Sequence, residues 1–125
     1  MNKQTKITLQ ELLRRKEQML EAKKVPKTKE LYINSLAGTI TITGATSALA
    51  KDAQEMENGD AYLVYQCVTD PCLKSKELQE GFGCVEPMEI VEKLFDPGEI
   101  PQISVECLRL SGYIDGVKAV DDVKN

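Results

Sequence analysis

Cysteine is the residue type in this chain with the widest range of chemistry, because its thiolate can ligate a metal or attack an electrophile. The four cysteines are Cys67, Cys72, Cys84 and Cys107. A zinc site built from cysteines alone usually contains two close pairs, and these spacings include no Cys-x-x-Cys. Cys67 and Cys107 stand in apolar helical patterns, where a free cysteine acts as a small hydrophobic residue. We therefore predict reduced, structural cysteines and no metal site.

The other polar residues form no catalytic set. The chain contains no histidine and no tryptophan, so the commonest general base and the commonest nitrogen ligand of metals are both missing. Ser104 and Ser111 have no histidine to activate them. Gly81-Phe82-Gly83 follows a predicted helix and precedes no Gly-Lys-Ser/Thr, which favours a tight turn over a phosphate-binding loop. The sequence thus predicts no catalytic residues, no cofactor-binding residues and no enzymatic activity.

Charge is distributed unevenly, although the net charge is only −4. Residues 1–30 hold nine Lys or Arg and four Glu, a net charge of +5, and the remaining 95 residues hold seven basic and sixteen acidic side chains, a net charge of −9. A basic segment of this kind binds an anionic partner, folds against its own acidic body or solubilises the chain. We do not expect nucleic acid to be the partner, because DNA-binding proteins usually pair such a helix with a helix-turn-helix partner or a dimer.

Length and composition predict one domain over residues 1–125. With 42% hydrophobic and 29% charged residues in 125, the chain resembles an ordinary globular protein that can bury a core. No apolar run approaches the ~20 residues of a membrane span, and no apolar stretch follows the first residues as in a signal peptide. We expect a cytoplasmic protein with no membrane partner.

The first part of this domain is predicted as a basic N-terminal helical arm over residues 1–28. A capping box that begins at Thr8 opens a helix, because its side chains satisfy the first backbone N–H groups. Leucine and methionine recur at helical spacing after it. Lys24 closes the last turn, and Pro26 ends the helix.

A β-hairpin is predicted over residues 29–44. Residues 39–43 alternate strictly between threonine and isoleucine, and Gly38 permits a tight reversal before them. A hairpin alone is marginal in water, so it must cover a core or join another sheet. The fold class we predict is α+β: a helix-rich single domain with one β-hairpin.

The last two parts are a helical body over residues 45–112 and a tail over residues 113–125. Apolar periodicity, Gly and Pro divide the body into several helices. Thr46 or Ser47 is predicted to cap a helix that runs towards Met56, and Ser75 to cap a short helix that ends near Gly81. The other predicted helices run from about Asp60 to Val68, from Pro87 to Phe95, and from beyond Gly98 to Leu110.

The tail holds the candidate partner-binding residues. Ile114, Val117, Val120 and Val123 recur at spacings of three and would form one apolar edge of a last helix. Gly116 and nearby aspartates weaken that helix, so on its own it should fray. Such an edge can accept a partner helix or simply cap the core, and both interpretations remain open.

Three stretches of the chain resemble the XkdN-like family of phage and prophage proteins. They are Leu9-Gln10-Glu11-Leu12-Leu13 with its Lys/Arg run, Thr28 to Ile42, and the motifs from Asp70-Pro71-Cys72-Leu73 through Phe82-Gly83, Pro87-Met88-Glu89 and Pro97-Gly98-Glu99 to Leu110-Ser111-Gly112-Tyr113. Together they cover most of the chain in the order typical of the family, although each motif alone is weak.

The resemblance implies a tail assembly chaperone of PBSX-type contractile-tailed phages. Such a protein would act in the cytoplasm of the bacterial host cell and bind the tape measure protein during tail morphogenesis. The tail tube protein is a second candidate partner, and self-association is compatible with the role. The family has no catalytic residues to transfer to this chain. Two alternatives stay open: a nucleic-acid-binding prophage regulator that uses the basic arm, and a structural component of the tail.

Overall fold

An antiparallel sheet is the centre of residues 27–116 in the computed structural model, which describes residues 6–120. Strands β1 (Thr28–Ile33) and β2 (Gly38–Thr43) pair from Thr28 opposite Thr43 to Ile33 opposite Gly38. A short 3-10 turn, η1 (Asn34–Leu36), joins them. The predicted hairpin is therefore confirmed. The residue with left-handed torsions is Ala37, with φ of 51°, rather than the neighbouring Gly38.

A third strand extends the hairpin on its β2 side. The predicted helix from 60 to 68 ends at Cys67 as α4 (Gly59–Cys67), and the chain continues as β3 (Val68–Asp70). Val68 lies opposite Ile42 in β2, and the Thr69 hydroxyl donates to the carbonyl oxygen of Thr41 at 3.3 Å. The helical assignment of Val68 was wrong. Val68 belongs to β3, which satisfies the backbone groups on the side of β2 that faces away from β1. A local sequence pattern does not reveal such pairing.

Two of the remaining helices of this region begin at caps that the sequence predicts, whereas the helix predicted from Pro87 begins two residues later, at Glu89. Thr46 accepts a hydrogen bond from the Leu49 amide, and Ser75 accepts one from the Leu78 amide, so both predicted N-caps are confirmed. The helices are α3 (Ser47–Gln54), α5 (Lys76–Gly81), α6 (Glu89–Leu94) and α7 (Glu99–Leu110).

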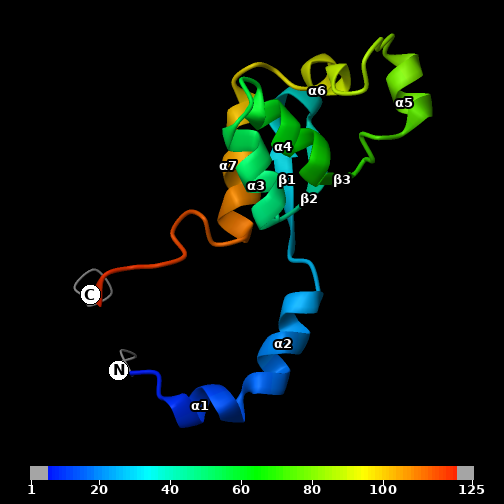
Figure 1. The fold of residues 1–125 in the computed structure, drawn as a ribbon. Coiled ribbons are helices and arrows are strands. Elements are labelled where there is room, and N and C mark those ends of the chain that lie inside the picture. The colour runs from blue at the N-terminus through cyan, green and yellow to red at the C-terminus, as the bar shows by residue number, and fades with distance from the viewer. Residues whose placement is uncertain (1–5, 121–125) are drawn as a thin grey trace. The chain divides into compact units, whose positions relative to one another are not determined.

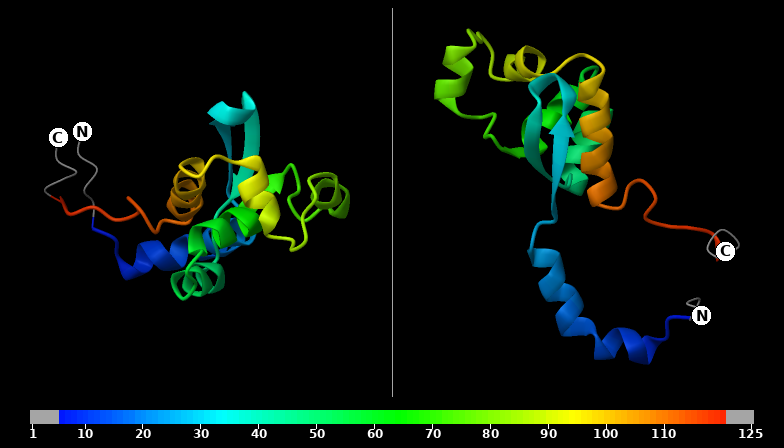
Figure 2. Two further views of the ribbon diagram at one scale, coloured as in Figure 1. Left: turned by 90° about the horizontal axis from the view of Figure 1, so that it is seen from above. Right: turned by 180° about the vertical axis from the view of Figure 1, so that it is seen from behind.

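Helices cover one face of the sheet, as the two views of Figure 2 show. α7 packs against α4 and contacts both β1 and β2. Alternation in β2 places Ile40 and Ile42 in the core, at 3% and 0% exposed. The fully buried side chains are Ile42, Val64, Cys67, Leu73, Ile90, Val91, Ser104 and Cys107.

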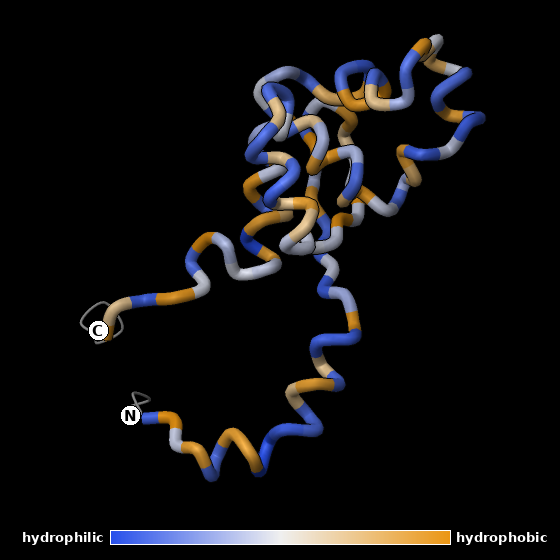
Figure 3. The backbone as a smooth tube through the Cα atoms, in the orientation of Figure 1, coloured by the Kyte–Doolittle hydropathy of each residue, from blue (hydrophilic) through white to orange (hydrophobic). Residues whose placement is uncertain are grey.

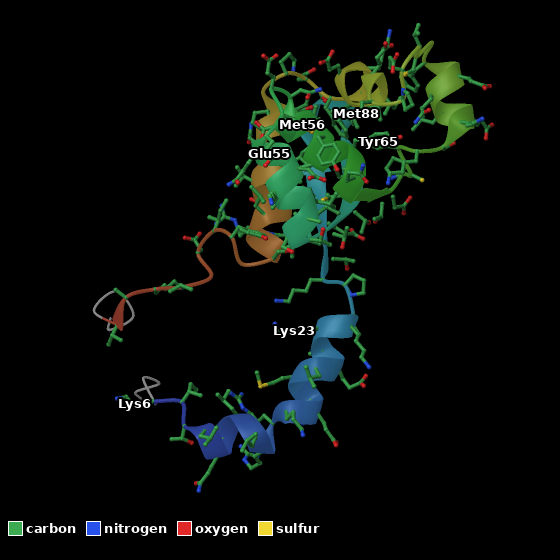
Figure 4. The ribbon with its side chains drawn as sticks, in the orientation of Figure 1. Lys6, Lys23, Glu55, Met56, Tyr65 and Met88 are labelled. Carbon is green, nitrogen blue, oxygen red and sulfur yellow. The ribbon has the colours of Figure 1, made fainter. Side chains whose placement is uncertain are left out.

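The segment around α5 lies at the periphery of this region (Figure 1) and has no buried residue in its helix. Leu73, which is 0% exposed, anchors its start. The Gln79 side-chain amide donates to the carbonyl oxygen of Leu73 at 2.8 Å and to the hydroxyl of Tyr65, on α4, at 3.5 Å. Figure 4 labels Tyr65 on α4.

The chain divides into two units: the first holds residues 1–26 and 117–125, and the second, which we call the second unit, holds residues 27–116. The described helices of the first unit are α1 (Leu9–Arg14) and α2 (Lys16–Lys24), which we call the arm. Thr8 accepts a hydrogen bond from the Glu11 amide at 3.1 Å, so the predicted cap is confirmed. The expected single helix is interrupted at Arg15, whose φ of −95° and ψ of 6° depart from α-helical torsions.

The α+β, helix-rich fold class is confirmed. Among residues 6–120, no helix is long and apolar enough to cross a membrane.

Candidate protein-binding surfaces

The four cysteines differ in their exposure to solvent. All four are free, with Cys67 and Cys107 buried, Cys84 half-buried and Cys72 exposed. The pKa of the Cys107 thiol lies far above its usual range, because it shares a hydrogen bond with Cys67 and is buried. A thiol in this state is protonated and is a poor nucleophile. In the part of the chain that the structure describes, no three Cys, Asp or Glu residues come together as a metal site.

Glu99, the first residue of α7, ties that helix to the hairpin. Its carboxylate accepts hydrogen bonds from the Ser35 hydroxyl at 2.7 Å, the Ser35 amide at 3.1 Å and the Asp96 amide at 2.9 Å. The Ser35 hydroxyl is the main reason that the pKa of Glu99 lies below its usual range. No cation lies within ion-pair distance of this carboxylate among the described residues. Glu99 is therefore ionised at neutral pH, and no neighbouring cation in the described part of the chain balances its charge.

Glu106, two turns later on α7, ties the helix to β1. Its carboxylate accepts a hydrogen bond from the Lys29 ammonium at 2.7 Å, and the Nε atom of Arg109 lies 3.6 Å away. The Lys29 hydrogen bond is the main reason that the pKa of Glu106 is lowered. Arg109 in turn pairs with Asp115. These groups hold α7 against the edge of the sheet.

One hollow lies between β1 and α7, and a second adjoins it on the surface of α7 itself; we call the two together the α7 hollow. The first has a volume of about 220 Å³ and the second about 260 Å³, and they share Gln102 and Glu106. Each is smaller than the roughly 300–1,000 Å³ of pockets for small molecules. Such hollows fit individual side chains of another protein. The first is lined by Leu31, Tyr32, Ile33, Asn34, Glu99, Gln102, Ile103 and Glu106, and the second by Pro101, Gln102, Val105 and Glu106.

The arm presents apolar side chains to solvent. Neither α1 nor α2 contains a buried residue. Figure 3 shows hydrophobic positions alternating with hydrophilic ones along both helices. The exposed apolar residues in and beside the arm, with their exposed fractions, are Ile7 55%, Leu9 71%, Leu12 41%, Leu13 59%, Met19 38%, Leu20 59% and Val25 67%. Exposed apolar residues in this number are typical of a protein-binding surface.

The tail residues are not presented by one helix. Residues 111–119 form turns and irregular backbone, so the predicted last helix is wrong over this range. Ile114 is half-buried in the second unit, whereas Val117 and Val120 are 92% and 60% exposed. The fourth residue, Val123, lies outside the described residues.

A family match covers almost the whole chain. The model of the phage XkdN-like tail assembly chaperone family matches residues 1–124 of the chain. The chain belongs to this family of phage tail assembly chaperones. The match includes the arm, the sheet, the helices and the tail. No curated protein and no solved structure gives a significant match to this chaperone.

Family membership sets the general role of this chaperone. It serves the assembly of phage tails, which is a non-catalytic role, and its partners are phage tail proteins. The α7 hollow is a surface that sequence reasoning missed. Its only local signal is the i, i+3, i+7 spacing of Glu99, Gln102 and Glu106 on one helix face. The other wall comes from β1, which lies far from α7 in the sequence.

Proposed function

We propose that this chaperone binds the tape measure protein during tail morphogenesis, in the cytoplasm of the bacterial host cell and without enzymatic activity. The observation that supports this most strongly is the family match over residues 1–124. The tail tube protein is a second candidate partner.

The proposal has a physical basis. A long amphipathic helix without a partner exposes apolar surface that promotes aggregation. A chaperone protects such a helix by covering its apolar face with side chains at matching intervals. The exposed apolar residues of the chaperone supply contacts of this kind.

Within this function, we assign the tail as part of the binding surface for the tape measure protein. Val117 and Val120 are largely exposed, and the backbone before Val120 is irregular. A segment of this kind can become ordered on a partner helix at the cost of some binding free energy. Ile114 and Val123 complete the apolar spacing of three in the sequence.

Co-expression with the tape measure protein tests both statements. The wild-type chaperone should co-purify with it and keep it soluble. A variant with Val117, Val120 and Val123 replaced by serine should co-purify less while its circular dichroism spectrum stays unchanged. The matched control replaces Leu36, Phe82 and Val85, exposed apolar residues outside the arm and the tail, by serine.

The outcomes separate the general function from its assigned surface. A wild-type chain that neither binds nor solubilises the tape measure protein overturns the proposed function. Binding that the tail variant leaves unaltered, or that the control variant reduces equally, removes the tail from the binding surface. Loss of helical content in the tail variant would show instead that these valines stabilise the fold.

A further inference from the structure

One face of α2 combines apolar groups with positive charge. Lys16, Met19, Leu20 and Lys23 recur at i, i+3, i+4 and i+7, which places all four on the same side of the helix. Met19 and Leu20 are 38% and 59% exposed, and Figure 4 marks Lys23 near the end of the helix.

The two lysines on this face have uncommitted charges. Arg14 and Arg15 pair with Glu11, and Lys24 pairs with Glu21. No ion pair involves Lys16 or Lys23 within residues 6–120. The α2 face therefore offers two apolar side chains flanked by two available cations.

The α7 hollow has the complementary chemistry. Leu31, Pro101 and Val105 contribute apolar surface to its walls. Glu99 contributes a carboxylate that no cation neutralises in the described part of the chain. Residues 27–116 as a whole hold fifteen acidic and seven basic side chains. A surface of this composition attracts a basic amphipathic helix.

From this complementarity we infer that the arm of one copy of the chain binds the α7 hollow of a second copy. The arm needs a partner, because helices of six and nine residues are marginal in water by themselves. The hollow of a second copy supplies both the negative charge and the apolar surface that match the arm.

A reciprocal exchange of arms would produce a dimer with two-fold symmetry. Each copy then gives one arm and receives one, so the same contact forms twice. Opposite charges across the contact make the dimer weaken as salt screens them. This dimer does not depend on which tail protein the chaperone binds.

Sedimentation of the full chain and of two variants tests the inference. The arm variant carries Leu13→Glu and Leu20→Glu, and the hollow variant carries Gln102→Lys and Val105→Lys. All four positions are exposed, so the fold should persist, as circular dichroism will check. We expect a wild-type dimer and, for each variant alone, a dissociation constant raised roughly tenfold or more.

Mixing the two variants is the decisive step. The hollow variant still has a native arm, and the arm variant still has a native hollow. The mixture should therefore form a heterodimer through one intact contact, although each variant alone is largely monomeric. The matched controls are Gln10→Glu with Gln18→Glu on the arm, and Gln54→Lys with Val85→Lys on the second unit. They repeat the charge changes at exposed positions outside both surfaces and should stay dimeric.

Other outcomes overturn the inference. A wild-type chain that is monomeric at the highest concentration shows that the arm does not bind a second copy. A hollow variant that remains a dimer points to pairing between arms. A mixture that stays monomeric although wild type is a dimer shows that the arm and the hollow are not partners of each other.

Discussion

Glu99 shows what a potentially reactive side chain does in this fold. A carboxylate with a shifted pKa is often a catalytic candidate, but here every hydrogen bond to it comes from Ser35 or Asp96. It joins η1 to the start of α7 and accepts backbone amides as a capping group does. The lowered pKa is therefore evidence of a structural contact.

This contact predicts an acid-sensitive contribution to stability. Because the pKa of Glu99 is lower in the folded chain than in the unfolded chain, its stabilisation is complete above the reference value of about 4.3 and is lost as the pH falls through the folded value. Glu99→Gln should lower the free energy of unfolding at pH 7, and the difference from wild type should shrink at about pH 3. Urea unfolding at both pH values measures this.

Glu57→Gln is the control for that experiment. Glu57 is exposed, and no hydrogen bond or ion pair is found for it in the described ranges. Its substitution should change stability little at either pH. A Glu99→Gln effect of equal size at both pH values would contradict the assigned charge contact.

Gly59 and Gly81 differ in the space that a side chain would find at each position. A Cβ atom on Gly59, the first residue of α4, would overlap the carbonyl oxygen of Ala53, whereas one on Gly81 in α5 would meet nothing within 4 Å. Gly59→Ala should therefore destabilise the chain by about 1–3 kcal/mol through overpacking. Gly81→Ala should stabilise it by about 0.4–1 kcal/mol by restricting the unfolded chain. Thermal unfolding of the pair checks both signs, and equal effects would refute the close approach at Gly59.

At the scale of elements, the helices of the arm and α7 are stabilised by different interactions. α7 buries Ile100, Ile103, Ser104 and Cys107 within the core of residues 27–116. The arm buries none of its residues and relies on local features, namely the Thr8 cap and ion pairs to Glu11. Exposed ion pairs of this kind contribute little, typically below about 1 kcal/mol.

Hydrogen exchange should report this difference. Amides of α1 and α2 should exchange faster than those of α7, because the arm can open without unfolding the second unit. If the arm docks on a second copy, its protection should also rise with protein concentration, while that of α7 should not. Protection of the arm equal to that of α7 at low concentration would contradict the prediction.

At the scale of the whole molecule, one side chain outside regular structure completes the core. Leu73 lies in the turn after β3 and is 0% exposed. It joins the same cluster as Ile42 and Val64 and attaches the peripheral α5 segment to that cluster. Its burial couples the periphery to the sheet.

Substitution of this residue should destabilise the whole second unit. Leu73→Ala should lower the free energy of unfolding by about 2–5 kcal/mol, because it leaves a cavity in a closed core. Leu36→Ala, at a position 44% exposed, should cost only about 0.5 kcal/mol. Chemical denaturation measures both, and a small effect at Leu73 would show that the α5 segment is not coupled to the core.

Local chemistry was sufficient to predict many of the elements. Thr8, Thr46 and Ser75 cap helices as expected, because a capping hydrogen bond spans only three residues. The alternation of threonine and isoleucine in β2 predicted the hairpin, because the alternation is also a short-range feature that shows which face of one strand is apolar. The motifs that resemble the family also identified its general role.

Contacts between distant segments decided the rest. Val68 follows a helical pattern, yet it pairs with Ile42 because β2 had an open edge. Val117 and Val120 keep an apolar spacing, but residues 111–119 form no helix because Gly116 and the aspartates leave it without enough local support. The β1 wall of the α7 hollow lies beside α7 only in the folded chain. Residues close together in the sequence thus account for the short-range structure, and histidine chemistry is excluded by composition alone. Which surfaces are complete depends on folding, because their walls come from segments that are far apart along the chain.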